Sequence, residues 1–209
     1  MPISEQKPLV ATPSEHAGTR GFVAIGASAG GLQALTTVLC ALPGDFPAPI
    51  AVVQHLDPRY RSLMAQILGR KTHLFVREAA VGVRAEPGFV YVAPPDHHLL
   101  IEPDGTFTLT RSELVHFVRP SIDLLFESLA GAFRERAVGV ILTGSGSDGA
   151  AGVSAIKRMG GTVIVQDEKS AEFSGMPLAA QQAASVDLVL PLEEIAPALR
   201  RVVGPRAPR

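Results

Sequence analysis

Residues 26–31, with the sequence Gly-Ala-Ser-Ala-Gly-Gly, are the segment that most restricts how this chain can fold. The run before them, Phe22 to Ile25, is apolar at every position, as expected for a strand buried on both faces of a parallel sheet. The residues from Leu32 onward place apolar side chains at helical spacing. A strand, a tight turn and a helix therefore meet at Ser28. Such a turn can present its backbone amides to a phosphate or its serine as a nucleophile.

The rest of the chain alternates apolar strands with amphipathic helices. This alternation predicts a doubly wound α/β fold, in which a mainly parallel sheet carries helices on both faces. Residues 72–112 differ, because they read as short strands with antiparallel pairing, including a hairpin near residues 97–110. The predicted strands span residues 22–25, 50–53, 73–76, 89–93, 98–102, 106–110, 137–142, 162–165 and 186–190. The predicted helices begin at Leu32, Asp57, Ser121, Ala150, Met176 and Pro191.

Composition excludes several classes of protein. The chain has 209 residues, a formal net charge of −1 and a single cysteine. A disulfide framework within the chain is therefore excluded, and nothing in the charge attracts nucleic acid. No stretch approaches the ~20 apolar residues of a membrane helix, and residues 1–20 lack the apolar core of a signal peptide. We expect a cytoplasmic protein with a disordered leader at 1–20, one domain at 21–203 and a tail at 204–209.

Three loops that follow predicted strands carry side chains with catalytic chemistry. Ser28 follows the first strand, His55 follows the second, and Asp148 lies in the loop after strand 137–142. Sites in such sheets lie beyond the carboxyl ends of the strands. If strand 137–142 pairs with the free side of the first strand, the three side chains converge. His55 can then accept the proton of Ser28, while Asp148 orients the imidazole and stabilises its charge.

Each of these residues also has an ordinary structural explanation. Ser28 can cap the helix after it, Asp148 can cap the helix that begins at Ala150, and a lone histidine is commonly solvated or structural. A nucleotide-binding turn is a further alternative. A serine side chain stands at its middle glycine position, however, and residues 54–55 (Gln-His) occupy the place of the acidic residue that binds ribose.

The neighbouring loops supply candidates for the walls of the site. The glycine-rich loop 143–149 lacks the lysine of a phosphate-binding loop, and its amides at Ser145 and Gly146 can form an oxyanion hole. Loop 166–175 is expected at the rim. The arginines at 59 and 61 are expected to be solvated, and Ser121 is expected to cap its helix. The paired histidines 97–98 have no third ligand at suitable spacing, so no metal is expected.

Several motifs occur together along the chain. They are residues 25–31 (IGASAGG), 54–55 (QH), 91–98 (YVAPPDHH), 119–126 (RPSIDLLF), 142–149 (LTGSGSDG) and 175–177 (GMP). In this order they resemble the chemotaxis protein-glutamate methylesterases, the CheB family, over about residues 21–203. The resemblance implies that Ser28 is the nucleophile, His55 the general base and Asp148 its partner. The residues implied to line the site are Ala29, Gly30, Ser145, Gly146 and Met176.

The resemblance also implies an activity. The family hydrolyses γ-methyl esters of glutamate on the cytoplasmic region of chemoreceptors, releases methanol and needs no cofactor; many members also deamidate glutamine. Two features depart from the family pattern. Residues 1–20 are too few for the family's N-terminal receiver domain, so phosphorylation of such a domain is not expected. Ser145 stands where methionine is expected, and Ala29 where threonine is common. A non-catalytic interaction module of the same fold remains an alternative, as does a nucleotide-binding domain.

Overall fold

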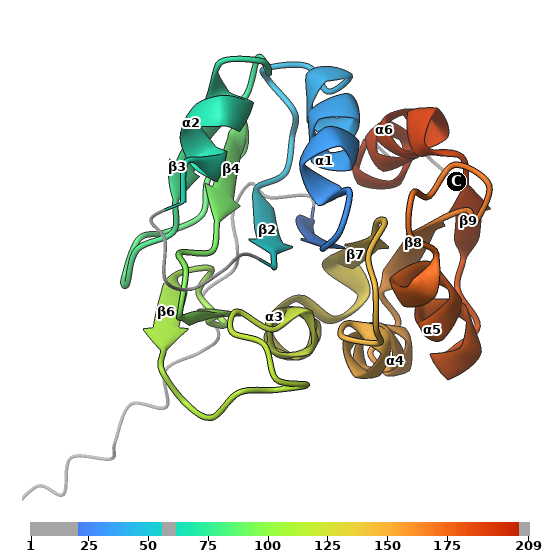
Figure 1. The fold of residues 1–209 in the computed structure, drawn as a ribbon. Helices are drawn as coiled ribbons and strands as arrows, with labels where there is room; N and C mark the ends of the chain where they lie inside the picture. Colours follow the sequence, from blue (N-terminus) through green and yellow to red (C-terminus); the bar gives the residue numbers. More distant parts are fainter. Residues whose placement is uncertain (1–20, 56–61, 205–209) are drawn as a thin grey trace, which may run out of the picture.

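The computed structural model describes residues 21–55 and 62–204. The predicted leader, nearly all of the predicted tail, the predicted helix start at Asp57 and the arginines at 59 and 61 lie outside these residues. Figure 1 shows a central sheet between two layers of helices, with a small hairpin beside one edge. Within the described ranges, none of the helices combines the length and the apolar character that crossing a membrane requires.

The sheet contains seven strands, all paired in parallel, in the order β3-β4-β2-β1-β7-β8-β9. These strands are β1 (Phe22–Ala27), β2 (Ile50–Gln54), β3 (Phe75–Glu78), β4 (Phe89–Val92), β7 (Ala137–Ile141), β8 (Thr162–Gln166) and β9 (Leu188–Leu190). The hairpin of β5 (His98–Ile101) and β6 (Phe107–Thr110) is a separate antiparallel sheet. The doubly wound α/β prediction and the predicted hairpin are therefore confirmed.

Helices cover both faces of the sheet (Figure 1). On one face lie α1 (Gly31–Cys40), α2 (Met64–Gly69) and α6 (Leu192–Val203). On the other face lie α3 (Ile122–Phe133), a 3₁₀ turn η1 (Arg134–Arg136), α4 (Ala150–Arg158) and α5 (Gly175–Ala183). The interior strands are almost wholly apolar because each has helices above and below it.

The prediction of antiparallel pairing throughout residues 72–112 is wrong. β3 and β4 join the main sheet, and β4 pairs in parallel with both β3 and β2. The segment that connects β3 to β4 bonds instead to the hairpin of β5 and β6. The Ala85 N–H donates to Gly105 O at 2.9 Å, and the Phe107 N–H donates to Val83 O at 3.0 Å. These backbone groups are satisfied by the hairpin, which leaves β4 free to extend the parallel sheet.

β1 is the strand at which the order of the strands in the sheet reverses. It pairs with β2 on one side and with β7 on the other, so the loops after β1, β2 and β7 are neighbours. All six of its residues are buried. A Cβ on Gly26 would lie 2.5 Å from Ile122 Cγ2, so glycine allows the start of α3 to approach the end of β1. The predicted convergence of the three loops is therefore confirmed.

Candidate active site

Ser28 lies in the turn between β1 and α1. Gly30 completes this turn with φ of 75°, a left-handed conformation that glycine adopts without strain. The Ser28 N–H donates to Thr143 O at 3.0 Å, and the Ser28 carbonyl accepts the Gly31 N–H at 2.9 Å. The Thr143 hydroxyl also donates to Ala29 O at 3.0 Å. The turn is thus held against the loop after β7 by its backbone, and the Ser28 hydroxyl takes no part in this.

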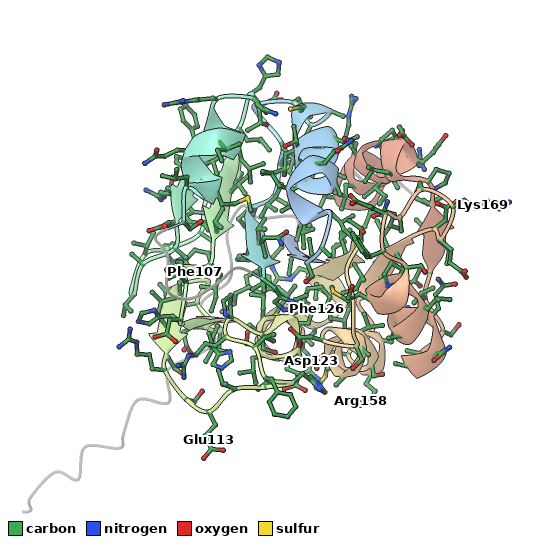
Figure 2. The ribbon with its side chains drawn as sticks, viewed as in Figure 1. Phe107, Glu113, Asp123, Phe126, Arg158 and Lys169 are labelled. Carbon is green, nitrogen blue, oxygen red and sulfur yellow. The ribbon has the colours of Figure 1, made fainter. Side chains whose placement is uncertain are left out.

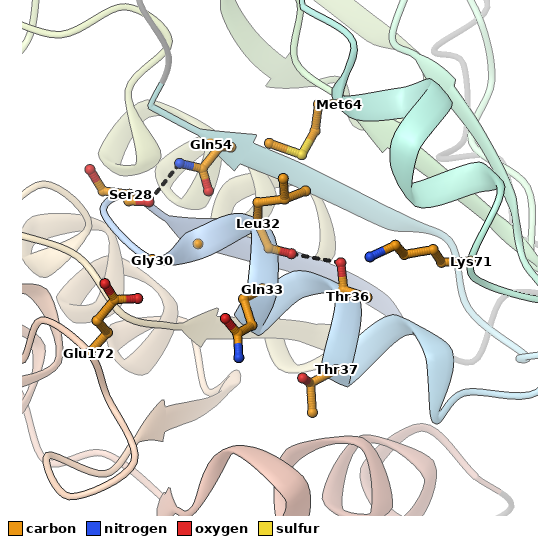
Figure 3. A pocket seen from close by; sticks show the side chains of 11 residues that line it. Ser28, Gly30, Leu32, Gln33, Thr36, Thr37, Gln54, Met64, Lys71 and Glu172 are labelled. Atoms are coloured by element: carbon orange, nitrogen blue, oxygen red, sulfur yellow. Dashed lines mark hydrogen bonds between the residues drawn. The ribbon is translucent and has the colours of Figure 1, made fainter.

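Gln54 joins the loops after β1 and β2. Its side chain is only 6% exposed, and its Nε2 donates to Ser28 O at 2.7 Å and to His55 O at 3.0 Å (Figure 3). Sequence reasoning used this residue as evidence against ribose binding and as part of a motif, and it missed this structural role. The available signal was a polar amide that ends an otherwise apolar strand. Gln54 fixes the backbone of Ser28 relative to that of His55.

His55 contacts Asp148 directly. His55 Nε2 lies 2.8 Å from Asp148 Oδ2, and the two side chains are 14% and 4% exposed. Because a carboxylate only accepts hydrogen bonds, this contact assigns the ring proton of neutral His55 to Nε2. Nδ1 then carries the lone pair that can take a proton. Among the described contacts none joins Ser28 to His55, so the structure connects two of the three predicted residues and places the third in the adjacent loop.

Asp148 accepts four hydrogen bonds from the residues that the structure describes. Its Oδ1 accepts from the Ser121 hydroxyl at 2.8 Å and from the Asp123 N–H at 3.1 Å, while its Oδ2 accepts from His55 and from the Ile122 N–H at 2.7 Å. Burial acts to raise the pKa of Asp148, but these bonds, led by that from His55, outweigh it and hold the pKa below the usual carboxyl value. Asp148 is therefore ionised at neutral pH.

Asp148 also acts as the cap of α3. Its bonds to the N–H groups of Ile122 and Asp123 satisfy the first turn of that helix, whose positive end stabilises a carboxylate. Ser121 is the N-cap residue of α3, as predicted, but its side chain makes no bond to its own helix and donates to Asp148 instead. The partner comes from 27 residues away, so a local sequence pattern does not reveal it.

Asp123, which is on the first turn of α3 and is labelled in Figure 2, caps α4 in the same way. Its Oδ1 accepts the N–H groups of Gly149 at 2.9 Å and Gly152 at 2.8 Å, which caps α4 and secures the loop that carries Asp148. Burial, and after it the charge of Asp148, raise the pKa of Asp123. His116 Nε2 lies 3.2 Å from Asp123 Oδ2. His116, Asp123 and Asp148 thus gather closely, yet their carboxylates are occupied by helix N–H groups. Sequence reasoning missed Asp123 and His116.

The loop at residues 143–149 passes beside Ser28, since a Cβ on Gly144 would lie 2.9 Å from Ser28 Cβ. Within residues 21–55 and 62–204, no acceptor pairs with the N–H groups of Ala29, Gly30, Ser145 or Gly146. The predicted lining residue Met176 is 1% exposed, and its N–H donates to Gly144 O at 2.9 Å. Amides without intramolecular acceptors beside a hydroxyl can stabilise a negative oxygen.

Two pockets open beside these residues. One of about 590 Å³ begins at Ser28 and is lined by Gly30, Gly31, Leu32, Gln33, Thr36, Thr37, Gln54, Met64, Lys71 and Glu172 (Figure 3). Glu172 comes from the loop predicted at the rim. A smaller pocket of about 140 Å³ is lined by His55 and by Phe117, which is 94% exposed. The hydroxyl, the imidazole–carboxylate pair and the amides form a set suited to acyl transfer.

Comparison with known proteins gives consistent matches. Residues 23–199 match the CheB methylesterase family. A Leptospira interrogans protein named putative protein-glutamate methylesterase/protein-glutamine glutaminase is 47% identical over 174 residues, which are 83% of this chain and 90% of the relative. A Burkholderia lata protein named protein-glutamate methylesterase/protein-glutamine glutaminase 2 is 45% identical over 187 residues, 90% of this chain and 55% of the relative. The crystal structure of the Thermotoga maritima CheB methylesterase catalytic domain matches with a TM-score of 0.84 at 38% identity, covering 88% of this chain and 98% of that one.

Proposed function

Because the chain belongs to the CheB methylesterase family, we propose that it is a serine esterase that hydrolyses γ-methyl esters of glutamate side chains in proteins. The observation that carries the proposal is the 2.8 Å contact between His55 and Asp148, in loops that adjoin the loop of Ser28. An imidazole oriented by an ionised carboxylate activates a serine hydroxyl, which is otherwise a weak nucleophile.

The proposed reaction has two acyl-transfer steps. The Ser28 hydroxyl oxygen attacks the ester carbonyl carbon while its proton passes to Nδ1 of His55, and Asp148 stabilises the imidazolium. The carbonyl oxygen becomes negative and is stabilised by free amides near Ser28, such as that of Ser145. His55 returns the proton to the departing methoxide, which leaves as methanol. Water then attacks the acyl-enzyme with His55 as base, releasing the glutamate carboxylate and restoring Ser28.

The proposed substrate is the methylated cytoplasmic region of a chemoreceptor or a similar signalling protein. The names of the relatives support a protein-bound glutamate ester, and they add glutamine as a second substrate class. Glutamine requires no further residue, because ammonia replaces methanol as the leaving group of the same acyl-enzyme. The donor proposed at Ser145 is a backbone amide, so the serine side chain found there is compatible with the mechanism.

The proposal is tested with the purified chain and a receptor cytoplasmic fragment that carries labelled methyl esters. We expect labelled methanol to be released, and a serine-directed phosphonate to label Ser28 and block the release. A chain that neither releases methanol from a panel of methylated receptors nor reacts with the phosphonate would instead be an interaction module of the same fold.

Replacing Gln54 by alanine will slow turnover with little effect on substrate affinity. The change removes the two hydrogen bonds from Gln54 to the carbonyls of Ser28 and His55, at about 1 kcal/mol each, although the Ser28 carbonyl keeps the Gly31 N–H. The two loops are then free to separate. A displacement of about 1 Å can cost about 100-fold in rate. We expect kcat on a small glutamate γ-methyl ester to fall about 10- to 100-fold while KM stays nearly constant.

Two variants control this experiment. Gln54→Glu keeps the size of the side chain but lacks the N–H groups, so it should reproduce the loss. Gln182→Ala removes an exposed glutamine on α5 and should have no effect. A rise in KM at constant kcat would show that Gln54 contacts substrate rather than positioning the two loops.

A further inference from the structure

The pocket that begins at Ser28 is larger than one esterified side chain requires. Its volume of about 590 Å³ lies within the range of about 300–1,000 Å³ typical of sites for much larger ligands. It extends along α1, so that Leu32 and Thr36 form part of its wall (Figure 3). Leu32 is 38% exposed although it lies on the first turn of α1 beside the core. The pocket therefore has room for parts of a substrate that flank the reacting group.

The two ends of the pocket carry opposite charges. Glu172 lies beside Gly30 at the Ser28 end, and Lys71 lies at the other end with its side chain directed toward Thr36 (Figure 3). Within the described part of the chain, no carboxylate forms an ion pair with Lys71. An acidic side chain is thus disfavoured close to the reacting ester and favoured at the far end of the pocket.

The position of Lys71 is fixed by contacts with α1. The Cys40 Sγ donates to Lys71 O at 3.1 Å, and the hydroxyl of the next residue, Thr72, donates to Leu39 O at 2.8 Å. These bonds hold the backbone at the C-terminal end of α1. At a rise of about 1.5 Å per residue, Thr36 lies about 8 Å along the helix from Gly31. The backbone of Lys71 is therefore held beside the C-terminal end of α1, and its exposed side chain extends toward Thr36.

We propose that this pocket is a subsite for the protein substrate, and that Lys71 binds an acidic side chain four to seven residues from the esterified glutamate. In a helical substrate, residues separated by four or seven positions share a face and lie about 6 to 10 Å apart along the axis. This inference rests on the proposed function, since it takes the reacting glutamate to sit at Ser28. It adds a substrate preference for nearby acidic residues on the same helix face.

The test uses helical peptides that contain one γ-methyl glutamate, with Glu, Gln or Lys placed four and seven residues to either side. We expect KM for the Glu peptide to be about five-fold lower than for the Lys peptide, with equal kcat, because exposed ion pairs are weak. Lys71→Glu should reverse the preference, and Lys71→Met should abolish it. The preference of each variant is expressed relative to its own hydrolysis of a small glutamate γ-methyl ester, which removes any effect of the substitution on the reacting site.

Lys169→Glu is the matched control. It makes the same change of charge at an exposed lysine near the edge of the molecule, outside the pocket (Figure 2). The subsite is overturned if wild type shows no preference among the peptides, or if Lys169→Glu shifts the preference as much as Lys71→Glu. Peptide affinities are also measured on Ser28→Ala. A charge preference there without hydrolysis by wild type would retain the subsite and overturn the proposed function.

Discussion

Replacing Ser28 by alanine will abolish ester hydrolysis and leave the fold unchanged. In a nucleophilic mechanism, loss of the attacking hydroxyl lowers kcat/KM by about 10⁴-fold or more, because the remaining groups can only assist attack by water. The fold should persist because the Ser28 contacts that hold the turn are made by its backbone N–H and carbonyl. The measurements are methanol release from a methylated receptor fragment and thermal unfolding of the same sample.

Ser185→Ala is the control for this experiment. Ser185 is exposed and lies outside both pockets, so its loss should change neither activity nor stability. If Ser28→Ala retained a tenth or more of the wild-type activity, another group would have to be the nucleophile.

The second large effect is expected for Asp148→Asn, which will reduce both activity and stability. An asparagine in a triad of this type lowers kcat about 10⁴-fold by favouring the wrong histidine tautomer. At Asp148 the same change also turns an NH₂ group toward donors that now bond to a carboxylate oxygen. We expect the free energy of unfolding to fall by about 2–3 kcal/mol, since a helix cap and a charged hydrogen-bond acceptor are lost together.

The stability effect should depend on pH. The pKa of Asp148 is lower in the folded protein than its usual value of about 3.9, so its contribution is complete above that value. The contribution is lost as the pH falls through the folded-state pKa. The difference in unfolding free energy between wild type and Asp148→Asn should therefore be constant near neutral pH and shrink in acid below about pH 4. Urea unfolding at a series of pH values measures it.

Asp123→Asn should change the pH dependence of the unfolding free energy in the opposite direction to Asp148→Asn. The pKa of Asp123 is raised by burial, so its ionisation destabilises the folded protein as the pH rises through the interval between the unfolded-state and folded-state pKa values. Its asparagine variant can still accept the N–H groups of Gly149 and Gly152. A difference for Asp148→Asn that did not shrink in acid would show that its carboxylate charge is not what stabilises α3.

The sequence predicted the features that depend on short, strongly patterned segments. The apolar run before Ser28 predicted a buried parallel strand, and the short segments at 98–102 and 106–110 predicted the hairpin. The sequence placed Ser28, His55 and Asp148 in neighbouring loops on the condition that strand 137–142 pairs with the free side of the first strand. The structure meets this condition, since β7 pairs with β1. The catalytic roles of these residues, and of the predicted lining residues, stay predictions.

The sequence failed where distant parts of the chain supply hydrogen-bond partners. Parallel pairing of β3 with β4 depends on the hairpin, which satisfies the backbone between them. The bond from Ser121 to Asp148 spans 27 residues, and that from Gln54 to Ser28 spans 26. Local propensity contains no information on such partners, so the cap of α3 and the role of Gln54 became visible only in the folded chain.

Asp148 caps α3, and Asp123 at the start of α3 caps α4. This arrangement predicts which residues relatives without catalytic activity would retain. Asp148 bonds to the first turn of α3 and also to His55. Its loss would therefore destabilise the fold even in a relative that has no catalytic activity. Within residues 21–55 and 62–204, the hydrogen bonds of Ser28 are made by its backbone and not by its hydroxyl. On the proposed mechanism, we expect relatives that only bind partners to lose the serine at position 28 and to keep the aspartate at position 148.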